Sequence, residues 1–410
     1  MSPSKWAWLL VWSAAAVPAR AEPLTYAQAL SRAAETAPSI RSAGLRADAA
    51  RASGRAAGSL PDPRLSLGVE NLPVSGPMAG RFGDDEMTMA SVGVMQDVPS
   101  LAARRADSGR ARAEVGLADA QAAAETRDVR LATALAWVDL HYVEARIAAL
   151  DEVEAALRPV LEAAPAAVAR GARPGETLDP AEWLVALADR RSALLAEAGR
   201  ARAALSRWTG DPAPAASGPP PDPPVDPVAL RAGLERHPTL LVLDAGVGLA
   251  DAELAAAKAA RTPDWGWAVD YQKRDERFGD MISARVTLSL PIRQDRRQGP
   301  LVEARGADAT RARADREAAR RLLIAALEAD LAEHRMHHEL WDRARDGRLP
   351  LAQRRADLET ASYAAGTADL AAVLAALTAL ADARLDLLDK EAEARRDAVR
   401  INITYGTDTP

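Results

Sequence analysis

The residues best suited to chemistry are three histidines that lie within five positions of one another. His334, His337 and His338 are three of the five histidines in the chain, and Glu333 and Met336 lie among them. An i, i+4 pair such as His334 and His338 places two imidazoles on one face of a helix, a spacing that can bind a metal ion. Solvated helices also collect such residues, so the alternative is an ordinary charged surface.

The methionines form a second group with metal chemistry. Met87, Met89 and Met95 are predicted to lie on one face of a strand, with Met78 nearby. Thioethers are soft ligands that suit copper(I) or silver(I), although methionine is also a common space-filling residue. The candidate metal ligands are therefore His334, His338, Met87 and Met89.

The composition and the motifs exclude most enzyme classes. The 410 residues include no cysteine, which excludes disulfide frameworks, thiolate metal sites and cysteine nucleophiles. The segment from His338 to Asp342 approaches the H-E-x-x-H protease motif, but aspartate stands where the second histidine is needed. The formal net charge of −6 gives no general affinity for nucleic acid. We expect no catalytic residue, no cofactor and no nucleic-acid partner.

Residues 1–21 are predicted to be a signal peptide. Lys5 precedes an apolar stretch over 6–17, and Ala19-Arg20-Ala21 has the small-x-small pattern that signal peptidase cleaves. No later stretch is apolar enough for a transmembrane helix. We expect an exported protein that is either soluble in the periplasm or inserted in a membrane as strands.

A proline-rich linker over 211–227 divides the remaining chain into two similar halves, 22–210 and 228–410. Ala37-Pro38 in the first half matches His237-Pro238 in the second, and matching points recur roughly 200 residues apart. In each half, a pair of alternating segments precedes a long helical hairpin. This order indicates an old duplication.

Each half contains two segments in which apolar and polar residues alternate. They cover about 63–72, 87–98, 264–273 and 281–291. Strands of this kind are what a membrane β-barrel requires, but four are too few to close one, so other copies of the chain would complete it. The residues expected to face lipid are Leu67, Val94, Trp267 and Val286. The alternative is two hairpins packed on helices in the periplasm.

The predicted helices are too long for a compact domain. No proline occurs between Pro99 and Pro159, and a continuous helix of that length would run to roughly 90 Å. Helical hairpins are predicted over about 100–208 and 300–398, each turning back at a glycine-containing loop. Such hairpins indicate either the wall of a helical tube or an antiparallel coiled-coil bundle.

Three local motifs mark the ends of these elements. They are Leu60-Pro61-Asp62-Pro63-x-Leu65, Gly93-Val94-Met95-Gln96-Asp97-Val98-Pro99 and Ser362-Tyr363-x-x-Gly366-Thr367-x-x-Leu370-x-x-Val373-Leu374. With the order of the elements, they resemble the TolC family of outer-membrane efflux factors over essentially all of the mature chain. The first two motifs are similar to the heavy-metal cation efflux branch (CzcC/CusC-like) of that family.

The resemblance implies a fold that is mainly α with a membrane β-barrel. In such a TolC-like homotrimer, four strands per protomer form one barrel of twelve strands, continued by a long α-helical periplasmic tunnel. The implied location is the outer membrane of a Gram-negative cell, extending into the periplasm. The implied partners are outer-membrane lipid, a periplasmic adaptor (membrane fusion) protein and an inner-membrane pump of the resistance, nodulation and division (RND) type.

The resemblance also implies that the pore aperture and the adaptor contact lie at the tips of the hairpins. The candidate residues there are Gly171, Gly175, Gly366, Asp369 and Leu370. Where some members carry constriction aspartates, this chain has Ala372 and Ala375, with Asp369 about one turn earlier. A ring of Asp369 carboxylates would favour cations, and an exposed carboxylate at a helix start is the alternative.

The function expected from the sequence is a passive outer-membrane exit duct of a tripartite efflux system for heavy-metal cations. Export of drugs or proteins is the alternative within the same class. A periplasmic coiled-coil scaffold or metal-binding protein without a pore is the alternative from a different class.

Overall fold

The computed structural model describes residues 23–82, 84–168 and 179–406, so the predicted signal peptide lies outside the described residues. The chain forms two compact units. The described parts of the first unit lie within 23–36, 133–221 and 340–396, and those of the second within 37–132, 222–339 and 397–406. Each unit takes segments from both sequence repeats, so the units do not coincide with the halves 22–210 and 228–410.

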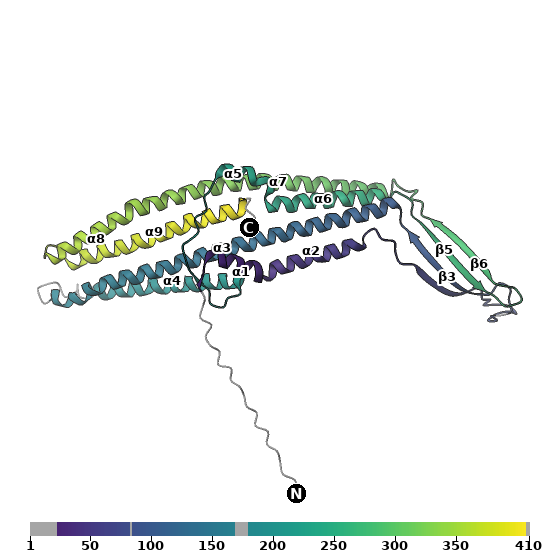
Figure 1. Cartoon of the computed structure of the whole chain (residues 1–410), viewed down its shortest axis with the longest axis horizontal. Coiled ribbons are helices and arrows are strands. Elements are labelled where there is room, and N and C mark those ends of the chain that lie inside the picture. The colour runs from purple at the N-terminus through teal and green to yellow at the C-terminus, as the bar shows by residue number, and fades with distance from the viewer. Residues whose placement is uncertain (1–22, 83, 169–178, 407–410) are drawn as a thin grey trace, which may run out of the picture. The chain divides into compact units, whose positions relative to one another are not determined.

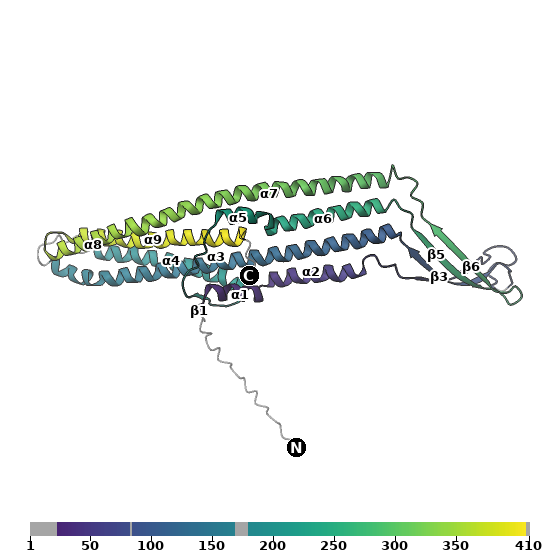
Figure 2. The ribbon, with the colours of Figure 1, turned by 45° about the horizontal axis from the view of Figure 1, so that its top comes forward.

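In the second unit, four helices lie side by side in the order α2, α3, α6, α7, and α3 and α7 belong to this unit up to residues 132 and 339 (Figures 1 and 2). Their bounds are Pro38–Ala56, Leu101–Val168, Pro238–Ala259 and Gln298–Arg343. Arg51 of α2 contacts Asp119 of α3 at 2.6 Å, and Arg316 of α7 contacts Asp244 of α6 at 2.9 Å. We call these four helices the helical layer. Its outer members are α2 and α7.

A hydrophobic cluster lies beside this layer in the second unit. The short helix α5 (Pro227–Gly233) and the end of α9 (Leu370–Tyr405) contribute to it together with α7. Its buried members are Leu230, Leu234, Leu327, Leu331, Ile401 and Tyr405. Apolar burial therefore fixes the chain's last helix against α7 within this unit.

An antiparallel sheet with the strand order β2-β3-β5-β6 completes the second unit. The bounds are Arg64–Glu70, Met89–Val98, Trp265–Lys273 and Met281–Leu288. The central strands β3 and β5 pair from Ala90 opposite Lys273 to Val98 opposite Trp265. Each predicted strand segment contains one of these strands, although β6 ends at Leu288 and the predicted segment continues to residue 291.

The first unit is built around the second part of α3, with α1 (Tyr26–Thr36), α4 (Asp179–Thr209), α8 (Leu349–Ala364) and most of α9. Trp137 of α3 is fully buried, and its Nε1 donates a hydrogen bond to the carbonyl oxygen of Leu24 at 2.8 Å. Leu24 belongs to β1 (Pro23–Leu24), which pairs with β4 (Ala215–Ala216) in the proline-rich linker. The linker is therefore anchored to α3 through β1.

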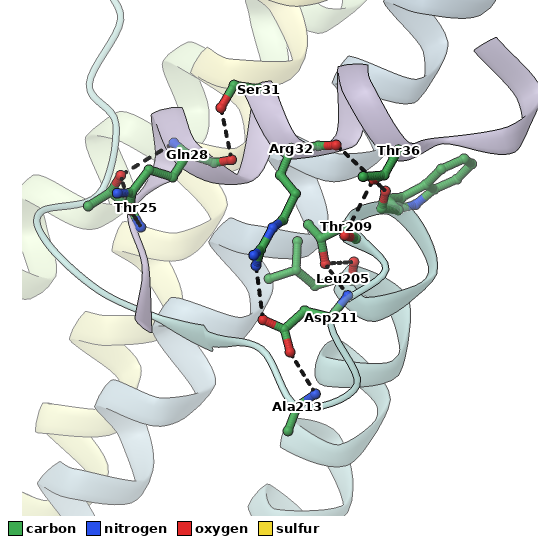
Figure 3. Close-up of polar contacts among 10 residues, drawn as sticks. Thr25, Gln28, Ser31, Arg32, Thr36, Leu205, Thr209, Asp211 and Ala213 are labelled. Carbon is green, nitrogen blue, oxygen red and sulfur yellow. Dashed lines mark hydrogen bonds and ion pairs between the residues drawn. The ribbon is translucent and has the colours of Figure 1, made fainter. Parts of the chain in front are cut away.

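Polar contacts fix the start of α1 and the end of α4 (Figure 3). Thr25 and Gln28 form a capping box, since the backbone N of Thr25 donates to Gln28 Oε1 at 2.9 Å and that of Gln28 donates to Thr25 Oγ1 at 3.3 Å. Arg32 contacts Asp211 at 3.2 Å, and Asp211 Oδ1 accepts from the backbone N of Ala213 at 3.0 Å. These contacts hold the first linker residues against α1.

A π-helical turn, Ala344–Arg348, joins α7 to α8 without a break in the helical run. Proline has no backbone N–H, and its ring clashes with the carbonyl group four residues earlier, so Pro350 disrupts ordinary α-helical bonding. The wider π turn accommodates this disruption. The helical run therefore passes through Pro350, just as α3 passes Pro159 and continues to Val168. The last helix also extends to Tyr405, beyond the predicted hairpin end near 398.

Among the described helices, none is both long enough and apolar enough to cross a membrane.

His237 caps α6 from a buried position. Its Nδ1 accepts a hydrogen bond from the backbone N of Thr239 at 3.1 Å, and its Nε2 lies 3.0 Å from a guanidinium nitrogen of Arg127. Burial, and then the positive charge of Arg127, lower the pKa of His237 from 6.5 to about 4. The folded protein therefore holds this imidazole in its neutral form.

We expect acidification to destabilise the protein through His237. The unfolded chain takes up a proton near pH 6.5, whereas the folded chain resists protonation down to about pH 4, so falling pH favours unfolding. Between pH 7 and pH 4 the wild type should lose up to about 3 kcal/mol more stability than a His237→Asn variant. Thermal unfolding followed by circular dichroism measures this difference. An equal loss in both proteins would contradict it.

Candidate functional site

The strand register brings apolar side chains together on one face of the sheet. Leu65 lies opposite Val94, Val94 opposite Val269, and Val269 opposite Ala284, so one row of apolar residues crosses all four strands. We call this surface the apolar sheet face. Its members are Leu65, Leu67, Val69, Ala90, Val92, Val94, Gln96, Val98, Trp265, Trp267, Val269, Tyr271, Lys273, Ile282, Ala284, Val286 and Leu288.

The four residues predicted to face lipid all lie on the apolar sheet face. Leu67 and Val286 are 75% and 74% exposed, and Val94 and Trp267 are 40% and 38% exposed. A contiguous exposed apolar surface of this kind marks contact with another protein or with a membrane. The four side chains therefore belong to one exposed, mainly apolar surface.

The opposite face of the sheet is polar. Arg64 of β2 pairs with Asp97 of β3, and Ser283 Oγ donates to Gln272 Oε1 at 3.1 Å. A side chain at Gly93 would collide with the carboxylate of Asp270, which crosses this face from the neighbouring strand. The sheet therefore separates an apolar surface from a hydrogen-bonded one.

Both edges of the sheet are open. Within the described residues, β2 pairs only with β3, and β6 pairs only with β5. An unpaired edge presents a row of backbone N–H and C=O groups. In hydrocarbon each such group without a partner costs several kcal/mol, so this sheet needs additional strands if lipid covers its apolar face.

The turn between α8 and α9 carries three of the predicted tip residues. Gly366 has a φ of 74°, a conformation that favours glycine, and it allows the chain to reverse. Asp369 is exposed, and its Oδ1 accepts a hydrogen bond from the backbone N of Ala372 at 2.7 Å, which caps α9. Leu370 is buried. Gly171 and Gly175 lie outside the described residues.

Leu370 anchors this turn within the first unit. It packs in a buried cluster with Val153 of α3 and with Leu374 and Ala381 of α9. Trp183 of α4 lies against the same cluster, and its Nε1 donates to Thr378 Oγ1 at 2.7 Å. Leu370 therefore has a packing role, whereas the Asp369 carboxylate is both a helix cap and an exposed charge.

The histidines predicted to bind a metal lie on one helix but do not form a complete site. The rings of His334 and His338 on α7 have centroids 6.2 Å apart. No group of three or more His, Cys, Asp or Glu residues suited to a metal ion occurs in the part of the chain that the structure describes. The pair stays a prediction, and a metal held there would need a further ligand from elsewhere.

His337 takes part instead in a charged network that the sequence did not reveal. Its Nδ1 lies 2.7 Å from Oδ2 of Asp397, and Asp397 Oδ1 also accepts from Arg400 at 3.2 Å. Arg400 contacts Asp330 at 2.5 Å, and the Tyr405 hydroxyl donates to Asp330 at 2.8 Å. Burial, and then the hydrogen bond to Asp330, raise the pKa of Tyr405. The network holds the end of α9 on α7.

The prediction that Met87 lies on the second strand is wrong. β3 begins at Met89, opposite Glu70 of β2. Met87 precedes the strand in a turn, where its backbone N donates to Asp85 Oδ1 at 2.8 Å, and its side chain is 55% exposed. Met89 is buried on the polar side of the sheet. The two thioethers therefore do not form the predicted row.

Comparison with known proteins identifies the fold. Residues 229–406 match the family model described as outer membrane efflux protein. No curated protein sequence matches the chain. A membrane protein from Pseudomonas aeruginosa has a TM-score of 0.79 at 16% identity, over 93% of this chain and 90% of that one.

Two further solved structures have slightly lower TM-scores. VceC, an outer membrane protein from Vibrio cholerae, has a TM-score of 0.76 at 16% identity, over 93% of this chain and 96% of that one. CusC, described in connection with transmembrane channel formation, has a TM-score of 0.78 at 16% identity, over 93% and 92%. The predicted TolC-like, mainly α fold class is confirmed. The family match covers residues 229–406 of the 410, and at 16% identity the solved structures show the fold alone.

Two substitutions separate the roles of Asp369. Asp369→Ala removes the acceptor for the backbone N of Ala372 and should lower the helix stability by about 1 kcal/mol, whereas Asp369→Asn keeps a cap but removes the charge. Thermal unfolding should therefore detect the alanine variant and leave the asparagine variant close to wild type. Equal destabilisation by both substitutions would contradict the capping role.

Proposed function

We propose that this chain is the outer-membrane channel of a tripartite efflux system. It acts as a passive exit duct and catalyses no reaction. The observation that carries the proposal is the apolar sheet face, which four strands expose on one side while the opposite side is polar. Lipid covers the first side and water fills the space behind the second, as in membrane barrels built from alternating strands.

The open edges support assembly with other copies of the chain. In our proposal, β6 of one copy pairs with β2 of the next, and three copies close a barrel of twelve strands. This pairing gives each edge N–H and C=O group a partner before it meets hydrocarbon. The ten residues of β3 match the length of a tilted membrane strand.

The helical tip is the proposed contact with the rest of the efflux system. A periplasmic adaptor protein and an inner-membrane RND pump are the proposed partners, and the pump supplies the energy. Gly366, Asp369 and Leu370 lie at the described turn, where Leu370 packing and the Asp369 cap hold the backbone. Gly171 and Gly175 remain proposed members of the same aperture.

Heavy-metal cations are the proposed cargo. The support is the likeness of the motifs Leu60 to Leu65 and Gly93 to Pro99 to those of the cation efflux branch. A ring of Asp369 carboxylates at the tip would favour cations over anions. Export of drugs or proteins through the same duct is the second candidate.

Growth of a deletion strain tests the cargo. The strain, with and without the restored gene, is grown across gradients of copper, silver, zinc, cobalt and cadmium and beside a panel of dyes and detergents. The proposal predicts sensitivity confined to one or two metals. Sensitivity to dyes alone would keep the duct and overturn the metal cargo.

Two arginine substitutions on β6 test the membrane contact. Val286→Arg places a charge on the apolar sheet face and should cost about 2 to 4 kcal/mol near the bilayer centre, so outer-membrane oligomers should disappear. Thr287→Arg is the matched control, because Thr287 lies on the polar face of the same strand. Membrane fractionation measures both. If neither substitution mattered and the protein were a soluble monomer, the periplasmic scaffold would replace the duct.

A further inference from the structure

The outer helices of the helical layer each carry an exposed, alanine-rich row of residues on the side that faces away from the layer. On α7, Arg305 contacts Glu253 of α6 at 3.1 Å and Arg313 contacts Asp251 at 2.5 Å, which defines the side that faces α6. The opposite side holds exposed residues at intervals of three or four. They are Ala304, Ala307, Arg311, Ala314, Ala318, Leu322, Ala325, Ala329, Ala332 and Met336, and we call them the α7 stripe.

The same arrangement occurs on α2 at the other edge of the layer. Ala43 and Ala47 are buried, and Gly54 lies close to Val115, so this side of α2 faces α3. The opposite side is exposed and again follows intervals of three and four residues. It comprises Pro38, Ser42, Leu45, Ala49, Ala52 and Ala56, which we call the α2 stripe.

Arginines predominate beside the α2 stripe and carboxylates beside the α7 stripe, while Asp48 and Arg321 on the same flanks pair within their own helices. Exposed Arg41, Arg46 and Arg55 flank the α2 stripe, and none forms an ion pair within the described residues. Four acidic residues flank the α7 stripe, and those that are paired contact only arginines of α7 itself. They are Glu303, Asp308, Asp315 and Glu317.

The positions of these charges match along the two helices. At 3.6 residues per turn, Arg41 and Arg55 fall on one flank of the α2 stripe and Arg46 on the other. On α7, Glu303 and Glu317 share one flank, and they are two heptads apart, as are Arg41 and Arg55. Asp308 and Asp315 occupy the other flank.

The α6–α7 contact indicates which residues of α2 would lie beside which residues of α7 along the helix axis. α2 and α6 begin at the matching prolines Pro38 and Pro238, so Ser53 is the α2 equivalent of Glu253, which contacts Arg305. An α2 helix placed beside the α7 stripe at that height runs antiparallel to α7. The resulting neighbours are Arg55 and Glu303, Arg41 and Glu317, and Arg46 with Asp308 and Asp315, each on the same flank.

We propose that the α2 stripe of one copy of this chain packs on the α7 stripe of the next copy, with these arginines paired to these carboxylates. The occupant is a second copy because one chain carries both complementary surfaces, at opposite edges of the same layer. The open strands β2 and β6 lie at the corresponding edges of the sheet. A contact between unlike edges repeats around a closed ring. This inference rests on the assembly in the proposed function and names the residues that join its helices.

Paired cysteines test the contact. The chain has no cysteine, so an Ala52→Cys, Ala307→Cys double variant contains only the introduced thiols. Alanine stripes allow helices to approach closely, and these two positions lie at the same height, within reach of a disulfide in the oxidising periplasm. We expect covalent oligomers on non-reducing gels that disappear on reduction. Ala52→Cys with Ala329→Cys is the matched control, because Ala329 lies on the same stripe about six turns away.

Charge reversal tests the ion pairs. Arg55→Glu, added to the Ala52→Cys, Ala307→Cys variant, should lower the yield of covalent oligomer about fivefold. Adding Glu303→Arg as well should restore the yield. Arg112→Glu, at an exposed position of α3, should leave the yield unchanged.

The oligomeric state separates this inference from the proposed function. Assembled wild-type oligomers in which positions 52 and 307 do not link, or link no better than the control pair, would overturn the helix contact alone. Failure of Glu303→Arg to rescue the yield would overturn the ion pairing. A monomeric wild-type protein would overturn both the proposed function and this inference.

Discussion

The hydrogen-bonding capacity of the outer strands constrains the rest of the molecule. Within the residues that the structure describes, β2 and β6 each pair along one edge, and their other edges carry backbone groups that need partners. Contact with water is unfavourable for the apolar sheet face, because leucine, valine and tryptophan side chains are exposed on it. In the proposed function, other copies of the chain supply the missing strand partners.

The helical layer also has two unoccupied outer sides, but these differ from the sheet edges in what they need from a partner. Adjacent helices of the layer are joined by ion pairs such as that between Arg316 of α7 and Asp244 of α6. The outer sides of α2 and α7 instead carry the alanine-rich stripes, with mainly arginines beside one and mainly carboxylates beside the other. Helices satisfy their own backbone groups, so their edges require only packing and charge matching, whereas strand edges require hydrogen bonds. The outer helices α2 and α7 and the outer strands β2 and β6 therefore occupy corresponding edges of the layer and of the sheet.

Local patterns predicted the elements because they depend on neighbouring residues. The alternation in each strand predicted Leu67, Val94, Trp267 and Val286 to face lipid, and the register places the four on one face of the sheet. The position of Met87 was wrong because pairing with β2, and a turn formed with Asp85, decide where β3 begins. Periodicity cannot detect either effect.

The sequence did not predict the contacts between segments that are far apart along the chain. His337 and Asp397 are far apart along the chain, and only the packing of α9 on α7 brings them together. The division into two units that mix both repeats has the same origin, since a repeat in sequence does not fix which helices share a core. The stripes on α2 and α7 also became visible only after the structure showed which side of each helix was already occupied.

The central claim is that copies of this chain complete one another in the outer membrane. The most direct measurement is the mass of the protein extracted from outer membranes, determined by light scattering after size-exclusion chromatography. The account predicts particles that contain three chains. A monomer recovered from the soluble periplasmic fraction would contradict it.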